Sequence, residues 1–162
     1  MAQSSVVWSA NAMACVQAGA PIVPNLYDAL SGAVRFRVNQ VGNIALICSI
    51  DHSTGQSGLR SLRLTYRDGD GSLGPSEVRA VVRRIRRTTG AVTTLANSEV
   101  RSNAPNAPNS GPTGWATHTS GSPGNVMNHL MDLVNYYYYV QINLERTDPG
   151  VPLSVMGVHL ID

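Results

Sequence analysis

The chain has 162 residues, of which 43% are hydrophobic and 14% are charged, and its formal net charge is +2. This length can enclose one sizeable core and is short for two domains, so we expect a single domain over residues 1–162. The low net charge and charge content argue against both a disordered chain and a broad nucleic-acid-binding surface. All 12 basic residues are arginine, which suits interfaces, although a GC-rich genome would produce the same bias.

Residues 1–32 mix small residues with prolines and predict an extended N-terminal arm, with short strands at Val6–Ser9 and Ala14–Gln17. The start of the chain has no basic region followed by an apolar one, so no classical signal peptide is predicted, and no run is long enough to span a membrane. The localisation stays unknown. The two cysteines, Cys15 and Cys48, allow one disulfide, but we favour two buried free thiols because free cysteine behaves as a small hydrophobic residue.

Alternation of apolar and polar residues predicts strands along the middle of the chain. Ala33–Val38 is expected to place Val38 inward together with the other alternate apolar residues, and Ser61–Arg67 has the same pattern. Asn43–Asp51 is a nearly continuous apolar run, as in a strand covered on both sides or a short buried segment. Residues 101–125 are rich in proline and glycine and predict a long surface loop pinned by one tryptophan.

The best hairpin candidate is Glu77–Val100, with a tight turn after its first strand. Ile85 is out of phase with the apolar positions before it, so we expect a β-bulge near Arg83 and Arg84. The dense basic cluster in this strand could bind an anionic surface, but we favour a sheet face on which acidic residues of neighbouring strands neutralise it. The cluster consists of Arg83, Arg84, Arg86 and Arg87, and the acidic candidates are Glu77, Glu99 and Glu145.

The strongest β signal is Leu133–Arg146, which contains four consecutive tyrosines. Such a run forms no helical stripe but suits a pleated strand. Alternation places Tyr138 and Ile142 on a core face, and Tyr137 and Tyr139 on an outer face that is half exposed to water. The run from Tyr136 to Tyr139 could form a platform for sugars. The favoured interpretation is that two of these tyrosines are core residues and two lie at a contact between sheets or subunits, because tyrosine is enriched at interfaces.

A final strand is expected at Pro152–Asp162, which brings the total to about eight to ten strands without an amphipathic helix of three turns. This pattern predicts an all-β fold, best satisfied by an antiparallel jelly-roll sandwich. In a jelly roll, each sheet is covered by the other on one side and can meet a neighbouring subunit on its other side. A plain Greek-key sandwich is the alternative.

Three further motifs carry little chemistry. Asp68 and Asp70 place oxygen ligands at alternate positions, as at the start of a calcium loop, but the distal glutamate is missing and we favour a hairpin turn, leaving calcium binding open. Cys48 with Asp51 and a histidine could suggest nucleophilic catalysis, but no framed nucleophile or acid–base pair is present, so we expect no enzyme activity. The histidines are dispersed and predict no metal site: His52, His118, His129 and His159.

The segments Leu62–Gly71, Val78–Leu95 and Tyr136–Leu160 resemble a group of bacterial and phage-associated β domains. Their shared pattern is a strand ending in an Asp-Gly turn, an arginine-rich strand, and a tyrosine strand followed by a closing strand. These domains are similar to the jelly roll of the tumour-necrosis-factor and C1q type, which forms trimers through aromatic-rich faces. The resemblance implies a jelly-roll fold and a homo-oligomer built from trimers, with no assigned reaction.

We therefore expect a self-assembling structural protein, such as a shell, appendage or fibre-head subunit, without a cofactor. Its partner would be further copies of itself, in contacts that use Tyr137, Tyr139, Arg83 and Arg86. A carbohydrate-binding module is the alternative function, and an enzyme is a more distant one. A glycan partner is compatible with the sequence, whereas nucleic-acid and membrane partners are not expected.

Overall fold

The computed structural model describes residues 5–19, 26–50, 58–121 and 126–162. These residues form β-strands and two short 3-10 helices, with no α-helix among them, so the all-β prediction is confirmed. Ten of the strands have three or more residues. The elements in chain order are β1 (Val6–Asn11), η1 (Ala12–Ala14), β2 (Val16–Gln17), β3 (Tyr27–Leu30), β4 (Ala33–Phe36), β5 (Gly42–Ser49), β6 (Gly58–Leu59), β7 (Ser61–Asp68), η2 (Gly71–Leu73), β8 (Glu77–Arg86), β9 (Val92–Thr94), β10 (Val100–Arg101), β11 (Ala116–Thr119), β12 (His129–Leu130), β13 (Tyr136–Arg146) and β14 (Leu153–Ile161). None of the described helices is long and apolar enough to cross a membrane.

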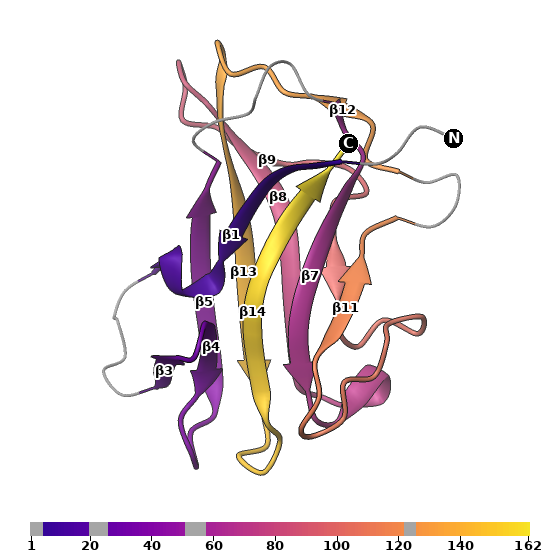
Figure 1. Cartoon of the computed structure of the whole chain (residues 1–162). Helices are drawn as coiled ribbons and strands as arrows, with labels where there is room; N and C mark the ends of the chain where they lie inside the picture. The colour runs from indigo at the N-terminus through magenta and orange to yellow at the C-terminus, as the bar shows by residue number, and fades with distance from the viewer. Residues whose placement is uncertain (1–4, 20–25, 51–57, 122–125) are drawn as a thin grey trace.

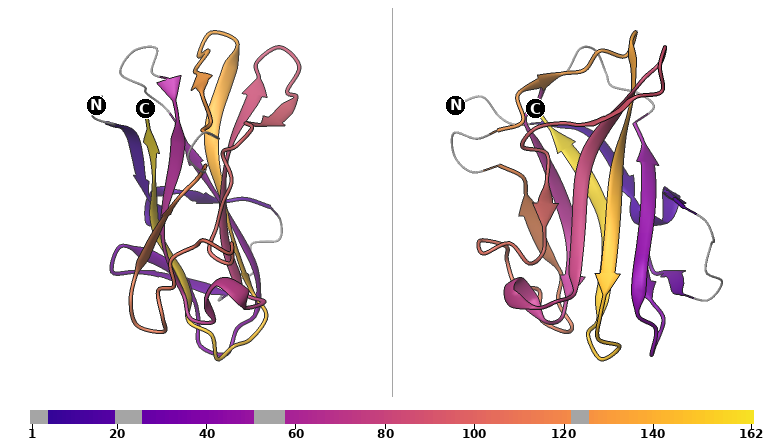
Figure 2. Two further views of the ribbon diagram at one scale, coloured as in Figure 1. Left: turned by 90° about the vertical axis from the view of Figure 1, so that its right-hand side faces the viewer. Right: turned by 180° about the vertical axis from the view of Figure 1, so that it is seen from behind.

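Two antiparallel sheets pack face to face as a sandwich (Figures 1 and 2). Sheet A has the strand order β11, β7, β14, β4, β3, and β1 also pairs with β14. Sheet B has the order β10, β8, β13, β5, β2, and β9 also pairs with β8. A small two-stranded sheet of β12 and β6 lies at one end of the sandwich (Figure 1).

The inner faces of the two sheets form one hydrophobic core, and the tyrosine strand β13 contributes to it as the alternation predicts. Tyr138 is 3% exposed and Ile142 is fully buried, whereas Tyr137 on the other face is 55% exposed. One predicted core position is wrong. Val38 is 82% exposed, because β4 ends at Phe36 and the chain turns away before Val38 can reach the core.

Strand β8 has no bulge, so the prediction of one near Arg83 and Arg84 is wrong. Its pairing with β13 is continuous from Arg86 opposite Tyr136 to Glu77 opposite Glu145. The regular register turns Arg84 towards the core side near the end of the sheet, where its guanidinium lies 4.3 Å from the centre of the Tyr136 ring. The aromatic ring stabilises this cation, so the strand keeps its register instead of bulging.

The N-terminal segment, predicted as an extended arm, packs on the body of its own chain wherever it is described. Strand β1 pairs with β14 of sheet A, and β2 pairs with β5 of sheet B. The chain between them, including η1, therefore crosses from one sheet to the other at the side of the sandwich (Figure 1). Trp8 packs partly buried against the core, which fixes β1 on the body.

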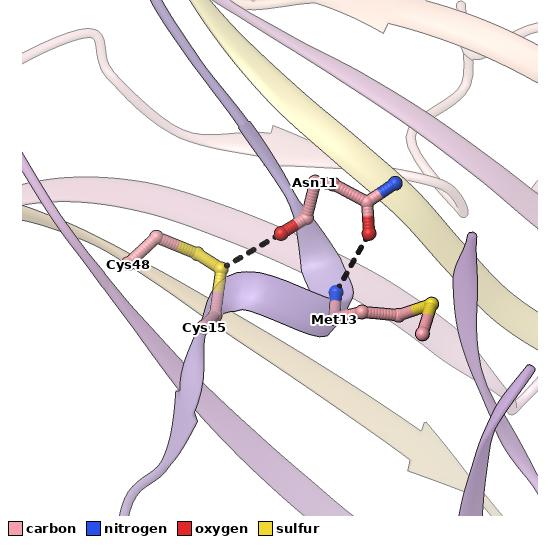
Figure 3. Close-up of a disulfide and its surroundings, with 4 residues drawn as sticks. All are labelled: Asn11, Met13, Cys15 and Cys48. Atoms are coloured by element: carbon pink, nitrogen blue, oxygen red, sulfur yellow. Dashed lines mark hydrogen bonds between the residues drawn. A yellow bond between two sulfur atoms is a disulfide. The ribbon is translucent and has the colours of Figure 1, made fainter.

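Cys15 and Cys48 form a disulfide, so the prediction of two free thiols is wrong (Figure 3). The pairing of Val16 with Ile47 brings Cys15 opposite Cys48, with 4.5 Å between their Cα atoms, which is within the range that a disulfide requires. Asn11 supports the approach, because its side-chain oxygen accepts a hydrogen bond of 2.9 Å from the Met13 backbone N–H (Figure 3).

Candidate functional site: the outer face of sheet B

The outer face of sheet B, which points away from sheet A, carries the aromatic and arginine side chains singled out in the sequence. Because directly paired residues of neighbouring strands point to the same face, the pairing defines rows of side chains across it. The first row contains Val92, Ile85 and Tyr137. The second row contains Thr94, Arg83, Tyr139 and Ser49, and the third contains Val81, Gln141, Ile47 and Val16. We call the first two rows the tyrosine face.

The tyrosine face leaves large apolar groups in water. Tyr137 is 55% exposed and Val92 is 53% exposed, while Ile85 between them is half-buried. These three side chains lie side by side on β13, β9 and β8. A contiguous exposed apolar row, in contrast to a single exposed residue, is typical of an interaction site.

Among the described residues, no carboxylate forms an ion pair with the arginines beside these tyrosines. The Arg87 guanidinium lies 4.0 Å from the centre of the Tyr137 ring, a cation–π contact. The Nε of Arg83 is buried and has no hydrogen-bond partner in the described structure. Throughout the described ranges, the four arginines of the cluster from Arg83 to Arg87 form no ion pair with a carboxylate at 4.0 Å or less.

The acidic residues expected to pair with this cluster lie elsewhere, so the predicted ion-paired face is wrong. Glu77 accepts hydrogen bonds of 2.5 and 2.8 Å from Arg101, and Glu99 lies 2.6 Å from Arg79. Glu145 is exposed and is paired with Glu77 across the strands, a juxtaposition of like charges. The outer face of sheet B is therefore basic and aromatic at one end, whereas the other end carries ion-paired Arg79 and Arg101 together with Glu145, which has no described ion-pair partner.

The four residues predicted to form a subunit contact do not all share a face. Tyr137, Tyr139 and Arg83 lie together on the tyrosine face. Arg86 is paired with Tyr136, so it points to the opposite side of sheet B, at the exposed end of the strand. Arg87 is not among the residues predicted to form this contact, although it packs on Tyr137. It lies beyond the end of β8, so alternation along the strand cannot assign its side chain to a face.

A hollow of about 630 Å³ opens where the tyrosine face reaches the end of the sheet. Its lining residues are Ile47, Ser49, Ile50, Ile85, Arg87, Leu133, Tyr136, Tyr137, Tyr138 and Tyr139. The four consecutive tyrosines therefore all contribute to one concave surface, although they alternate between the two faces of the strand.

The base of this hollow is held in place by hydrogen bonds. The Tyr138 hydroxyl accepts a hydrogen bond of 3.0 Å from the Asp132 backbone N–H and lies 3.0 Å from His129 Nε2. Burial, and then the charge of Arg84, lower the pKa of His129, so this ring is neutral at neutral pH. Tyr138 is thus a fixed structural residue, and Tyr137 is the tyrosine available to a partner.

The structure also bears on two other candidate sites from the sequence, the nucleophile at Cys48 and a metal site. The Cys48 sulfur is bonded to Cys15, so it cannot serve as a thiolate nucleophile in this state. Asp51 and His52 lie outside the described residues. Within the described ranges, no group of three or more His, Cys, Asp or Glu side chains is arranged to hold a metal ion.

Comparison with known protein families gives no match for this chain, and comparison with characterised proteins gives none either. The function is therefore argued from the geometry of the chain itself.

Proposed function

We propose that this chain is a structural protein that assembles with copies of itself through the outer face of sheet B. The observation that carries the proposal is the exposed row of Val92, Ile85 and Tyr137, flanked by arginines that form no ion pair with any described carboxylate. Exposed aromatic and apolar groups combined with arginine are the composition enriched at protein interfaces. Covering this row with a second subunit removes apolar surface from water.

Strand order supports a jelly-roll topology for the proposed subunit. Eight strands can be numbered from one to eight in chain order: β4, β5, β7, β8, β10, β11, β13 and β14. In sheet A, β14 (eighth) pairs with β4 (first) and β7 (third), and β7 pairs with β11 (sixth). In sheet B, β13 (seventh) pairs with β5 (second) and β8 (fourth), and β8 pairs with β10 (fifth). Two nested Greek keys of this kind define a jelly roll, a fold found in viral capsid and lectin domains.

The distribution of charge favours a second copy as the partner. One end of the outer face carries Arg83 and Arg87, and the other end carries Glu145. When two copies of the face meet in opposite directions, Arg83 and Arg87 of each lie towards Glu145 of the other, as in an isologous contact. The resemblance to trimeric domains implies a threefold contact instead.

The face is elongated. Eleven residues of β13 extend about 35 Å at the ordinary rise of a strand, whereas β2, β9 and β10 at its sides have only two or three residues each. A contact that takes ~800 Å² from each partner would therefore use most of this face.

The proposal is tested with a charge placed at the centre of the row. Tyr137→Asp should dissociate the assembly, measured by light scattering coupled to size exclusion, because it strands a carboxylate in a desolvated contact. Val38→Asp is the matched control, since it adds the same charge at an exposed apolar residue that precedes β5, whereas the tyrosine face lies at the end of β5. Dissociation by both variants alike, or by neither, would refute the assignment of this face.

A carbohydrate-binding function is the second candidate, and the hollow lined by the four tyrosines is the observation that favours it. Aromatic rings with a few polar groups, here Ser49 and Arg87, are the usual components of a concave ligand site. A glycan array with the native protein tests this candidate. Binding that is lost in Tyr137→Ala supports it, and an array without binding excludes the glycans presented.

A further inference from the structure

The segment from Asp68 to Ser76 forms a polar centre at the far end of the sandwich from the tyrosine hollow. It connects β7 to β8 and contains η2, which lies at the opposite end of the molecule from β12 in Figure 1. Gly71 has a φ of +73°, which permits the tight turn after the two aspartates. A side chain at Gly74 would collide with the Asp70 carboxyl group, so the loop closes tightly around that carboxyl.

Each of the two carboxyl groups has one bonded oxygen and one oxygen without a partner. Asp68 Oδ2 accepts a hydrogen bond from the Ser102 hydroxyl, and Asp70 Oδ2 accepts one of 3.1 Å from the Ser76 backbone N–H. The Oδ1 atoms of both aspartates are buried and have no hydrogen-bond partner in the described structure. Asp68 as a whole is only 1% exposed.

The two carboxyl groups lie within hydrogen-bonding reach of each other, and no positive charge of the described residues balances them. No arginine of the described chain forms an ion pair with either aspartate. The Tyr66 hydroxyl does not satisfy them either, because it donates a hydrogen bond of 2.7 Å to the Pro108 carbonyl oxygen.

We propose that Asp68 and Asp70 bind a divalent cation of the calcium type through their unpartnered Oδ1 atoms. Two adjacent carboxylates in a buried site are stable only when a cation or a proton lies between them. The donors in reach are all oxygens, which is the ligand type that Ca²⁺ prefers. Ca²⁺ also tolerates irregular geometry and can take its remaining ligands from water.

A bound cation would fix two segments that are distant in sequence, the Asp68–Asp70 turn and the chain at Ser102. Asp68 ends β7, Asp70 lies in the loop before β8, and Ser102 follows β10. The Ser102 hydroxyl also accepts a hydrogen bond of 2.9 Å from the Val78 backbone N–H, which connects the site to the start of β8. The expected effect of the cation is therefore on stability, independent of the tyrosine face and of self-association.

The experiment titrates CaCl2 into chelator-treated native protein and follows heat of binding and thermal unfolding, with MgCl2 as the comparison ion. We expect one site per chain, a higher unfolding temperature with Ca²⁺, and a loss of affinity of at least ~10-fold in Asp70→Asn. Asp148→Asn is the control, because Asp148 is also a loop aspartate and its side chain accepts a hydrogen bond from the Gly150 backbone N–H. This variant should respond to Ca²⁺ like the native protein. Native protein that shows neither heat nor a shift at millimolar Ca²⁺ would overturn the proposal.

A second measurement does not depend on the folding of an aspartate variant. Tb³⁺, which replaces Ca²⁺ at oxygen sites, should luminesce on excitation of tyrosine in the native protein, and Ca²⁺ should displace it. Tyr66 lies on the same strand face as Asp68 and should be the main donor, so Tyr66→Phe should lose most of the emission while keeping the Ca²⁺-induced thermal shift. Emission that Ca²⁺ does not reduce, or that Tyr66→Phe retains in full, would place the ion elsewhere.

Discussion

Gly157 of β14 lies against Ala10 of β1 so closely that a Cβ atom at Gly157 would be 2.6 Å from the Ala10 carbonyl oxygen. The contact lies beside the irregularity in the pairing of β14 with β7, between Val155 and Gly157. It allows β1 to pair closely with β14 within sheet A before the chain crosses to sheet B.

Gly157→Ala should therefore displace β1 and lower the free energy of unfolding by ~1 to 3 kcal/mol through overpacking. Urea denaturation measures the loss. Gly58→Ala is the control, since the nearest atom to its added Cβ would be 3.9 Å away. Equal stability of both variants would show that the close approach is relaxed in solution.

The disulfide should contribute strongly to stability. Cys15 and Cys48 are 33 residues apart in sequence, and closing a loop of that length in the unfolded chain corresponds to about 3 to 4 kcal/mol. The double variant Cys15→Ala, Cys48→Ala should unfold at a correspondingly lower urea concentration. Reductant should lower the midpoint of the native protein and leave that of the double variant unchanged, whereas an unchanged native midpoint would mean that the bond is absent in solution.

The register of the tyrosine strand can be tested at two adjacent residues. Ile142 is fully buried between the sheets, so Ile142→Ala should cost ~2 to 5 kcal/mol through lost transfer energy and the cavity left behind. Gln141 points to the outer face, and Gln141→Ala should cost little. Similar losses in both variants, measured by chemical denaturation, would mean that the strand is shifted by one residue.

Much of the sheet structure could be predicted because local alternation determines which face a strand buries. Tyr138, Ile142 and the apolar residues of Ser61–Arg67 are buried as the pattern indicates. The hairpin from β8 to β9 also forms near its predicted turn. In these segments each residue's environment follows from its immediate neighbours in sequence.

The features that could not be predicted depend on contacts between distant segments. The pairing of β2 with β5 brings Cys15 to Cys48, and nothing near either cysteine encodes that partner. Ile85 points to the outer face and Arg84 to the core side, because the Arg84 guanidinium packs against the Tyr136 ring. The unpartnered oxygens of Asp68 and Asp70 depend on the position of Ser102, which lies 34 residues from Asp68.

His129 should make the protein less stable in mild acid. Its pKa in the folded chain is lowered by burial and then by Arg84, so the unfolded chain binds more protons once the pH falls below the unfolded value of about 6.5. The stability that the neutral ring contributes is present above that pH and is lost as the pH decreases through the folded pKa.

The comparison is made between the native protein and His129→Gln, which can still bond the Tyr138 hydroxyl but does not titrate. Urea midpoints at about pH 7.5 and about pH 5 should differ more in the native protein than in the variant. Because both proteins contain the other titrating groups, including His118, His159 and Asp68, these cancel in the comparison. An equal change in both would show that His129 does not contribute.

Self-association of the native chain is the central claim, and sedimentation velocity at micromolar concentration and ordinary salt tests it most directly. The single chain has a mass of 17.3 kDa. The proposed role requires a species at a multiple of this mass, with a contact that buries at least ~1,200 Å² in total. A single boundary at the mass of one chain across the concentration series would contradict both the assembly and the structural function proposed for it.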